Sequence, residues 1–274
     1  MKLTFLGTGT SQGVPVIACR CNVCRSSDER DTRLRTSALL QADNNNILFD
    51  IGPDFRQQML CHHVDHLDAI LITHAHRDHV GGLDDIRSFN YVQHSKMNVY
   101  LNAEAKTALL RDYKYIFDYH QYPGLPEAEL HQVDNSQFSI LLPASQALST
   151  AEKKSNPAKN SQLEVVPICA MHKDLPILGY RIRNFAYITD ANYIAPSEME
   201  KLKGVDVMVI NALRKEKHFS HYSLPEALEV ISQVKPREAY LTHISHELGL
   251  HAVVERELPA GVYLAYDNLI IDIN

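Results

Sequence analysis

The chain has 274 residues, 45% of them hydrophobic and 22% charged, and a formal net charge of −6. This size and composition predict one globular domain of the larger α/β kind over residues 1–274. The net charge is negative, whereas proteins that bind long nucleic acids carry patches of basic residues. No stretch reaches the roughly 18 continuous apolar residues of a membrane span, and no signal-like N-terminus is present, so we expect a cytoplasmic protein without a membrane partner. A homodimer is left open.

Short β-branched and apolar runs, separated by turn residues, predict strands along the whole chain. In chain order they are KLTFLGTG, TSALLQAD, NILFDIG, DAILITHAH, NVYLNA, FSILLP, LEVVPICAMH, GYRIR, FAYITDAN, DVMVINA, EAYLTHI and VYLAYDNLIIDI. Apolar spacing predicts helices over 54–63, around 103–119 and over 224–234, the last with Ser223 and Glu226 at capping-box spacing. The interleaving predicts two sheets with helices outside them, and 149–162 reads as an exposed loop or hairpin tip.

Three histidines and an aspartate stand together at the end of one predicted strand, in ILITHAHRDHVGGL. The apolar run 69–73 leads directly into His74, His76, Asp78 and His79. In extended backbone a spacing of two residues points His74 and His76 the same way, while the other two turn back toward a second position. Imidazole with carboxylate suits Zn, Mn or Fe, and one open site cannot use all four groups. The motif therefore predicts a metal centre with two positions.

This His-x-His-x-Asp-His motif resembles the signature of the metallo-β-lactamase superfamily, and the resemblance extends through nearly the whole chain. It implies an α/β fold, an αββα four-layer sandwich in which two mixed β-sheets pack face to face with helices outside. It also implies three later ligands: His172 in CAMHKDLPILGYRI, the bridging Asp190 in AYITDAN, and His243 in AYLTHISH. Asp50 in ILFDIG matches an early aspartate that supports the metal loop without binding metal.

Three of the five cysteines lie within CRCNVC, at Cys19, Cys21 and Cys24. Clustered thiols in a reducing compartment are more often metal ligands than disulfide partners, and an odd number argues against a disulfide framework. A closed tetrahedral zinc site needs a fourth ligand, and by residue type Cys61 and Cys169 are candidates. Cys169 also suits the role of a small apolar core residue, because it lies in a strand-like run.

Within the superfamily the chain resembles most the phosphoribosyl cyclic phosphate phosphodiesterase, or PhnP-like, branch. The likeness lies in GTGTSQGVP, in the three-cysteine segment and in the ending LTHISH. It implies that a structural zinc takes its fourth ligand from His246, so that His243 and His246 face different metals. Such a zinc would tie the N-terminal loop to the C-terminal region and contribute directly to the folding free energy.

A further histidine is available for proton transfer in KEKHFSHYSLPEAL. His221 matches the histidine that, in the phosphodiesterase and tRNA 3′-processing branches, contacts the scissile phosphate and serves as general acid. The helix N-terminus that follows it favours an anionic substrate, whereas for His218 we expect a surface position. Two divalent ions, Zn or Mn, would lower the pKa of a bridging water, which then attacks phosphorus as hydroxide. His221 and the metal ligand Asp78 are the predicted catalytic residues.

The motifs together predict a binuclear metal-dependent hydrolase with one further structural zinc. Its predicted activity is that of a phosphodiesterase on a small phosphate diester, a class that includes cyclic phosphates of sugars and nucleotides. A tRNA 3′-processing nuclease is one alternative, although no long basic insertion is visible. A thioester or lactam hydrolase, which has no need of His221, is a second. A non-catalytic accessory protein of coenzyme biosynthesis is a third, and all three share the fold.

Residues 86–131 are expected to form a helical insertion that shapes the pocket. This segment and its immediate surroundings are rich in tyrosine, at Tyr91, Tyr113, Tyr115, Tyr119 and Tyr122. Aromatic residues at helical spacing also suit a packed core, so the pattern leaves both roles open.

Overall fold

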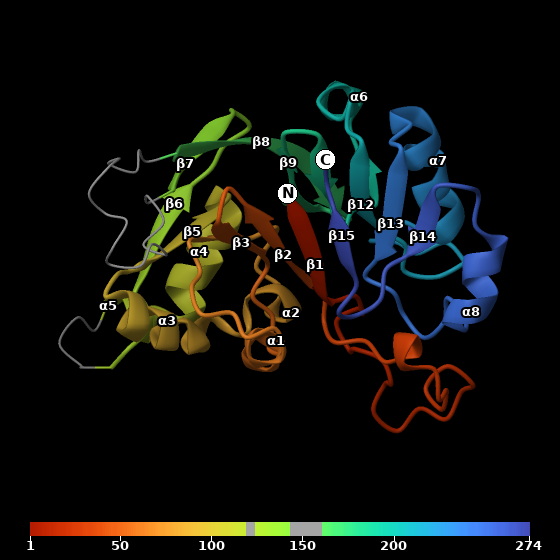
Figure 1. The fold of residues 1–274 in the computed structure, drawn as a ribbon, viewed down its shortest axis with the longest axis horizontal. Helices are drawn as coiled ribbons and strands as arrows, with labels where there is room; N and C mark the ends of the chain where they lie inside the picture. Colours follow the sequence, from red (N-terminus) through yellow and green to blue (C-terminus); the bar gives the residue numbers. More distant parts are fainter. Residues whose placement is uncertain (119–123, 143–160) are drawn as a thin grey trace, which may run out of the picture.

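The computed structural model describes residues 1–118, 124–142 and 161–274, which form two mixed β-sheets packed face to face with helices on both outer sides (Figure 1). The first sheet has the order β15 (Ile270–Asp272), β1 (Lys2–Gly7), β2 (Ser37–Ala42), β3 (Asn45–Phe49), β4 (Ala69–Leu71), β5 (Met97–Leu101), β6 (Ala128–Gln132). The second has the order β11 (Tyr193–Ile194), β8 (Ser161–His172), β9 (Leu175–Ile182), β10 (Phe185–Tyr187), β12 (Val207–Asn211), β13 (Glu238–Thr242), β14 (Val262–Leu264), and β7 (Phe138–Leu142) pairs with β8.

Helices pack on the outer face of each sheet, which completes the predicted αββα sandwich. The first sheet carries α1 (Phe55–Cys61), α2 (Arg77–Val80), α3 (Arg87–Gln93), α4 (Ala103–Asp112) and α5 (Lys114–Asp118). The second carries α6 (Pro196–Glu200), α7 (Leu224–Val234) and α8 (His251–Val254). Short 3₁₀ helices lie at Glu29–Asp31, Leu83–Ile86 and Glu255–Glu257. No helix among the described residues combines the length and the apolar character that crossing a membrane requires.

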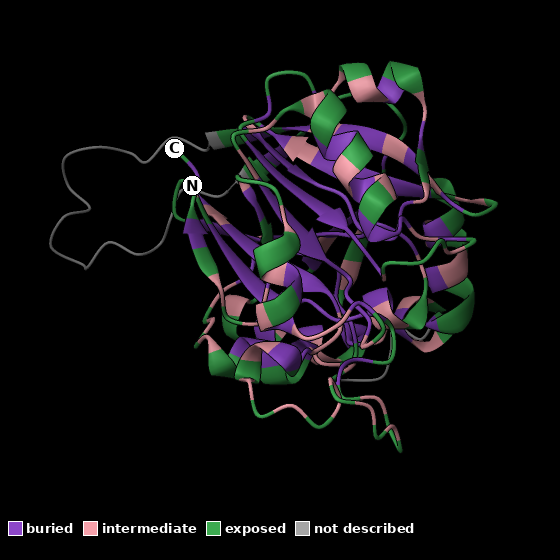
Figure 2. Ribbon diagram, turned by 90° about the vertical axis from the view of Figure 1, so that its right-hand side faces the viewer, coloured by how far each residue is buried: buried purple, intermediate pink, exposed green. Residues whose placement is uncertain are grey.

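Alternating side chains along the strands build three apolar layers. In β12, Val207 and Val209 point into the core between the sheets, whereas Met208 and Ile210 face the helices. This period of two is what a strand buried on both faces requires. Figure 2 shows the buried strands in the middle of the molecule, between helices whose outer sides are exposed. The helix over 224–234 forms as predicted, with its capping box of Ser223 and Glu226 in place.

Three predicted elements differ from the structure. The last predicted strand, VYLAYDNLIIDI, is two strands in different sheets, because β14 pairs with β13 while β15 pairs with β1. The helix predicted around 103–119 is broken at Tyr113 into α4 and α5. The segment expected as an exposed loop over 149–162 lies outside the described residues as far as 160, and residues 161–162 begin β8.

The prediction of a helical insertion over 86–131 is wrong in its structural part. The segment contains α3, α4 and α5, but it also supplies β5 and β6, which are strands of the first sheet. Tyr113 donates a hydrogen bond of 2.7 Å to the carbonyl of Val80, and Arg77 donates one of 2.8 Å to the Tyr113 hydroxyl. The segment therefore braces α2 from behind. Tyr119 and Tyr122 lie outside the described residues.

A buried polar network joins the loop before β2 to the C-terminal region. The guanidinium of Arg33 donates to Thr8 Oγ1 at 2.8 Å and to the carbonyl of Ala265 at 2.6 Å, and its other amino group lies 3.1 Å from Nδ1 of His251. Burial, and then the charge of Arg33, lower the pKa of His251 to about 4. Because the folded state resists protonation of this ring, its neutral form stabilises the fold above its ordinary pKa of 6.5, and that stabilisation is lost as the pH falls toward 4.

We therefore expect acid to destabilise the wild type more than the His251→Gln variant. Between about pH 7 and about pH 5 the difference in unfolding free energy should be about 2 kcal/mol, measured by urea denaturation at both pH values. Asp267 has the opposite pH dependence, because burial raises its pKa to about 6 and its protonation therefore stabilises the fold as the pH falls. Equal acid sensitivity in wild type and His251→Gln would contradict the assignment.

Candidate metal centre and active site

The ends of parallel strands bring the predicted ligands to one end of the sandwich. In the first sheet β3 runs parallel to β4, and Asp50 and His74 follow these strands. In the second sheet β10 and β13 run in the same direction, and Asp190 and His243 follow them, while β8 ends at His172. Carboxyl ends of parallel strands meet at one edge, which is where ligands collect in sheets of this kind.

Three of these positions have a left-handed backbone. Asp50 has a φ of 58°, Asp190 of 62° and His243 of 54°. A side chain other than glycine in this region costs on the order of 1–3 kcal/mol, and such costs concentrate at functional sites. The surrounding strands fix these conformations and aim the three side chains across the sheet ends.

One group of side chains consists of His74, His76 and His172, whose ring nitrogens lie within 4.8 Å of one another. Nε2 of His74 is 3.0 Å from Nδ1 of His76 and 3.9 Å from Oδ2 of Asp190. Nδ1 of His172 donates a 2.8 Å hydrogen bond to the backbone carbonyl of Asp190, which leaves Nε2 as the basic nitrogen. The orientation of His172 therefore suits a metal ligand.

A second group consists of Asp78, His79, Asp190 and His243. Oδ2 of Asp190 lies 3.3 Å from Nε2 of His79, and its Oδ1 lies 2.9 Å from Nδ1 of His243. Among the described residues, both of those ring nitrogens are buried without a hydrogen-bond partner. A buried polar atom without a partner costs free energy, so two such atoms that face one carboxylate indicate a binding site for a further group, such as a metal ion.

Asp50 holds the motif from behind, as predicted. Its Oδ2 lies 2.7 Å from Nδ1 of His79, and its Oδ1 accepts a 2.8 Å hydrogen bond from the backbone N–H of Thr73. The hydroxyl of Thr73 also lies 3.0 Å from Nδ1 of His74. These contacts fix the tautomers and the orientations of both imidazoles.

The electrostatic field of this site attracts positive charge. Burial acts to lower the pKa of His79, but the carboxylates of Asp190, Asp78 and Asp50 raise it well above its ordinary value. In the same way, His243 and His79 hold the pKa of Asp190 well below its ordinary value in spite of its burial. At His74 burial prevails and lowers the pKa well below 6.5. Basic imidazoles among ionised carboxylates are what a divalent cation requires.

The donor set fits two neighbouring divalent cations. Three imidazoles, those of His74, His76 and His172, offer nitrogens to one position. The carboxylate of Asp78 and the imidazoles of His79 and His243 face the other position. The carboxylate of Asp190 reaches both groups. Imidazole with carboxylate is the ligand set of catalytic zinc and also suits manganese.

His221, the predicted general acid, lies at the edge of this centre. Its Nε2 is 3.4 Å from Oδ2 of Asp190, while its Nδ1 is 3.0 Å from Oγ of Ser220 and 3.2 Å from Nδ1 of His218. His218, for which we expected a surface position, is partly exposed, and its ring contacts that of His221. Burial lowers the pKa of both histidines.

Two further residues contact the site. Oγ1 of Thr10 lies 3.3 Å from Nε2 of His243, and Ser220 contacts the proton-transfer candidate His221. Ser220 is adjacent to His221 in the chain, whereas the Thr10 contact joins residues 233 positions apart and depends on the N-terminal loop approaching the strand ends. A local motif does not encode such an approach.

The three-cysteine segment forms a separate group with His246. Nδ1 of His246 lies 3.3 Å from Sγ of Cys19 and 3.3 Å from Sγ of Cys21, and the ligand atoms of all four residues, including Cys24, lie within 4.8 Å of one another. Three thiols and one imidazole match a closed tetrahedral zinc site.

The other two cysteines bond elsewhere. Sγ of Cys169 donates to Oδ1 of Asn135 at 3.2 Å, and Sγ of Cys61 faces Asn268. Within the group of three cysteines and His246, the N–H of Cys24 and the ring of His246 lower the pKa of Cys21 to about 6, whereas burial raises that of Cys24 to about 11. The group thus already favours one thiolate.

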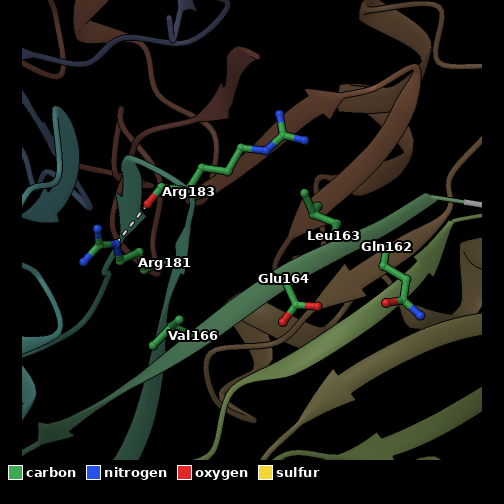
Figure 3. Close-up of a pocket in the computed structure, with 6 residues that line it drawn as sticks. All are labelled: Gln162, Leu163, Glu164, Val166, Arg181 and Arg183. Atoms are coloured by element: carbon green, nitrogen blue, oxygen red, sulfur yellow. Dashed lines mark hydrogen bonds between the residues drawn. The ribbon is translucent and has the colours of Figure 1, made fainter.

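A hollow on the second sheet lies apart from these groups (Figure 3). It is lined by Gln162, Leu163, Glu164, Val166, Arg181 and Arg183, from β8, β9 and the turn after β9. Arg181 donates to the carbonyl of Arg183 at 2.9 Å, and Arg183 is paired with Asp43. No histidine or cysteine of the three groups is among the residues that line this hollow.

Comparison with known proteins finds homologues that align over nearly the full chain. A solved structure described as a new diphosphatase from the PhnP family is 36% identical, covers 98% of this chain and 96% of its own, and superimposes with a TM-score of 0.85. Zinc-bound PqqB from Methylobacterium extorquens superimposes with a TM-score of 0.74 over 100% of both chains at 18% identity, which shows the fold alone.

A curated relative is longer than this chain. The octanoyltransferase of Porphyromonas gingivalis is 40% identical over 271 residues, which are 98% of this chain but 51% of the relative. The chain thus spans about half the length of that relative. Residues 45–244 match the model of the beta-lactamase superfamily domain. With that match and a PhnP-family homologue aligned end to end, the chain belongs to the beta-lactamase superfamily, as a metallo-β-lactamase fold hydrolase near the PhnP branch.

Proposed function

We propose that the chain is a binuclear metal-dependent phosphodiesterase that hydrolyses a small phosphate diester. The observation that carries this proposal is the position of Asp190, whose buried carboxylate joins the two ligand groups and also lies 3.4 Å from Nε2 of His221. The proposed proton donor, His221, and both cation positions therefore lie around the carboxylate of Asp190. The PhnP-family homologue, described as a diphosphatase, supports chemistry at phosphorus.

Two divalent ions, Zn or Mn, would supply a hydroxide nucleophile at neutral pH and stabilise charge on the phosphoryl oxygens. The chain itself supplies the proton. A water molecule releases one proton to solvent as its oxygen forms a bond to phosphorus, the bond from phosphorus to the leaving oxygen breaks, and Nε2–H of His221 protonates that oxygen. Ser220 and His218 hold the opposite side of the ring, so Nε2 stays turned toward Asp190. His221 then regains its proton from water.

We expect His221→Ala to lose activity in proportion to the leaving group's need for a proton. On adenosine 2′,3′-cyclic phosphate, whose leaving group is an alkoxide, kcat should fall by about 10²–10⁴-fold. On bis(p-nitrophenyl) phosphate, whose phenolate leaves without help, the loss should be far smaller. Metal content, measured by elemental analysis, should not change.

His62→Ala provides a matched control, since His62 is partly exposed and contacts Asn268 at 2.8 Å, away from the centre. Equal losses on both substrates in His221→Ala would refute general-acid catalysis by this residue. They would show instead that the ring holds the ligands in place.

Thioester hydrolysis is the competing function, favoured by the octanoyltransferase relative. A thiolate leaves without a proton donor, so this function predicts that octanoyl-coenzyme A is hydrolysed and that His221→Ala retains the activity. An accessory protein would bind metal and turn over neither a diester nor a thioester. The same substrates therefore separate all three functions.

A further inference from the structure

An exposed aromatic ring stands beside the proposed proton donor. Phe219 lies two residues before His221 and is 69% exposed. Exposed apolar residues scattered singly over a surface need no explanation. Phe219 differs because its loop is hydrogen-bonded to the segment that carries the proposed ligand Asp190. Nδ2 of Asn192 donates to the carbonyl of Phe219 at 3.3 Å.

The same asparagine holds a cationic residue. Oδ1 of Asn192 accepts a 2.8 Å hydrogen bond from the backbone N–H of Lys173, the residue after His172. The ammonium of Lys173 lies 5.8 Å from the centroid of the Phe219 ring, within the range of a cation–π contact. Its side chain remains 59% exposed, and its ammonium also lies 3.6 Å from Oδ2 of the exposed Asp174. We call Phe219, Lys173 and Asn192 the Phe219–Lys173 lip.

The surroundings of the lip restrict what it can bind. On one side the ring of His218 lies 4.4 Å from that of Phe219, centroid to centroid, and His218 in turn contacts His221. The lip is therefore continuous with the proton donor. An acyl chain would need a longer apolar groove, yet the named neighbours of Phe219 are an ammonium, an imidazole and an amide. A sugar alone would gain little from an exposed phenyl ring.

We propose that the Phe219–Lys173 lip binds the base of a nucleoside phosphate whose phosphate lies at the metal centre. The exposed ring of Phe219 stacks on the planar base, and the Lys173 ammonium attracts the negative charge of the phosphate. This inference rests on the proposed phosphodiesterase activity and names its substrate class. Stacking of a base on an aromatic side chain is sequence-tolerant and is lost on substitution by alanine.

Two five-membered cyclic phosphates test the lip, adenosine 2′,3′-cyclic phosphate and glycerol 1,2-cyclic phosphate, because only the first carries a base. In the metal-loaded protein, Phe219→Ala should lower kcat/KM for the adenosine substrate by about 10-fold, through KM. It should leave the glycerol substrate unchanged, and Phe219→Trp should retain the preference for adenosine. Tyr91→Ala removes an aromatic residue that is 81% exposed on α3 and should affect neither substrate.

Equal effects of Phe219→Ala on both substrates, or no effect on either, would overturn the inference. If the wild type turns over neither substrate, the proposed function fails. Equilibrium binding then tests separately whether the Phe219–Lys173 lip binds a base. Adenosine monophosphate should then bind the wild type more tightly than it binds Phe219→Ala, with no such difference for inorganic phosphate. Equal affinity of the two proteins for adenosine monophosphate would contradict the proposal that the lip binds a base.

Discussion

Replacement of Asp190 by alanine should abolish diester hydrolysis and remove metal from the active centre. The carboxylate is 2% exposed and lies within 3.9 Å of nitrogens on four histidines, His74, His79, His221 and His243. Loss of an outer partner of a ligand typically costs 10–100-fold, so we expect loss of this shared carboxylate to lower kcat/KM by more than about 100-fold. Elemental analysis should find the zinc of the cysteine group retained and the catalytic metals depleted.

The isosteric Asp190→Asn variant separates charge from packing, because it keeps the side-chain volume and removes the negative charge. It should lose metal and activity nearly as fully as Asp190→Ala while unfolding at a temperature close to that of the wild type. Asp65→Ala is the matched control, since that carboxylate is 90% exposed and remote from the centre. Full metal content and full turnover in Asp190→Asn would show that the carboxylate does not bridge the two positions.

Removal of one thiol from the cysteine group should destabilise the fold. Cys21→Ser removes one of the four ligands of the proposed zinc, which would join the loop carrying Cys19 and Cys24 to His246 in the C-terminal region. Structural zinc contributes its binding free energy to folding. A loss of several kcal/mol in a chain of this size should lower the melting temperature by about 10 °C.

Cys61→Ser is the matched control, because Cys61 is an exposed thiol outside the group. It should leave both the melting temperature and the zinc content unchanged. Differential scanning calorimetry and elemental analysis, made on the two variants and the wild type, give the comparison. Unchanged zinc content and stability in Cys21→Ser would mean that the group is three reduced thiols in a turn.

The sequence was most informative where a ligand set lies in one short segment. His74, His76, Asp78 and His79 follow a buried strand at fixed spacing, so local geometry brings them together. The superfamily resemblance implied the distant ligands, and the structure brings Asp190 to them because parallel strands of both sheets end at the same edge.

Features that depend on long-range pairing could not be predicted in the same way. No local signal divides VYLAYDNLIIDI between two sheets, because the division follows from which strands β14 and β15 meet. The strand β6, AELHQ, offers only two apolar residues, Ala128 and Leu130, and pairing with β5 makes it a strand. The contact of Thr10 with His243 similarly joins residues that lie 233 positions apart in the chain.

The central claim is tested most directly by hydrolysis of bis(p-nitrophenyl) phosphate by metal-stripped protein re-supplied with Mn or Zn. We expect turnover to return with the metal in the wild type and to stay absent in Asp190→Ala. If protein shown by elemental analysis to hold its full metal complement turned over no diester with either metal, the phosphodiesterase proposal would be wrong.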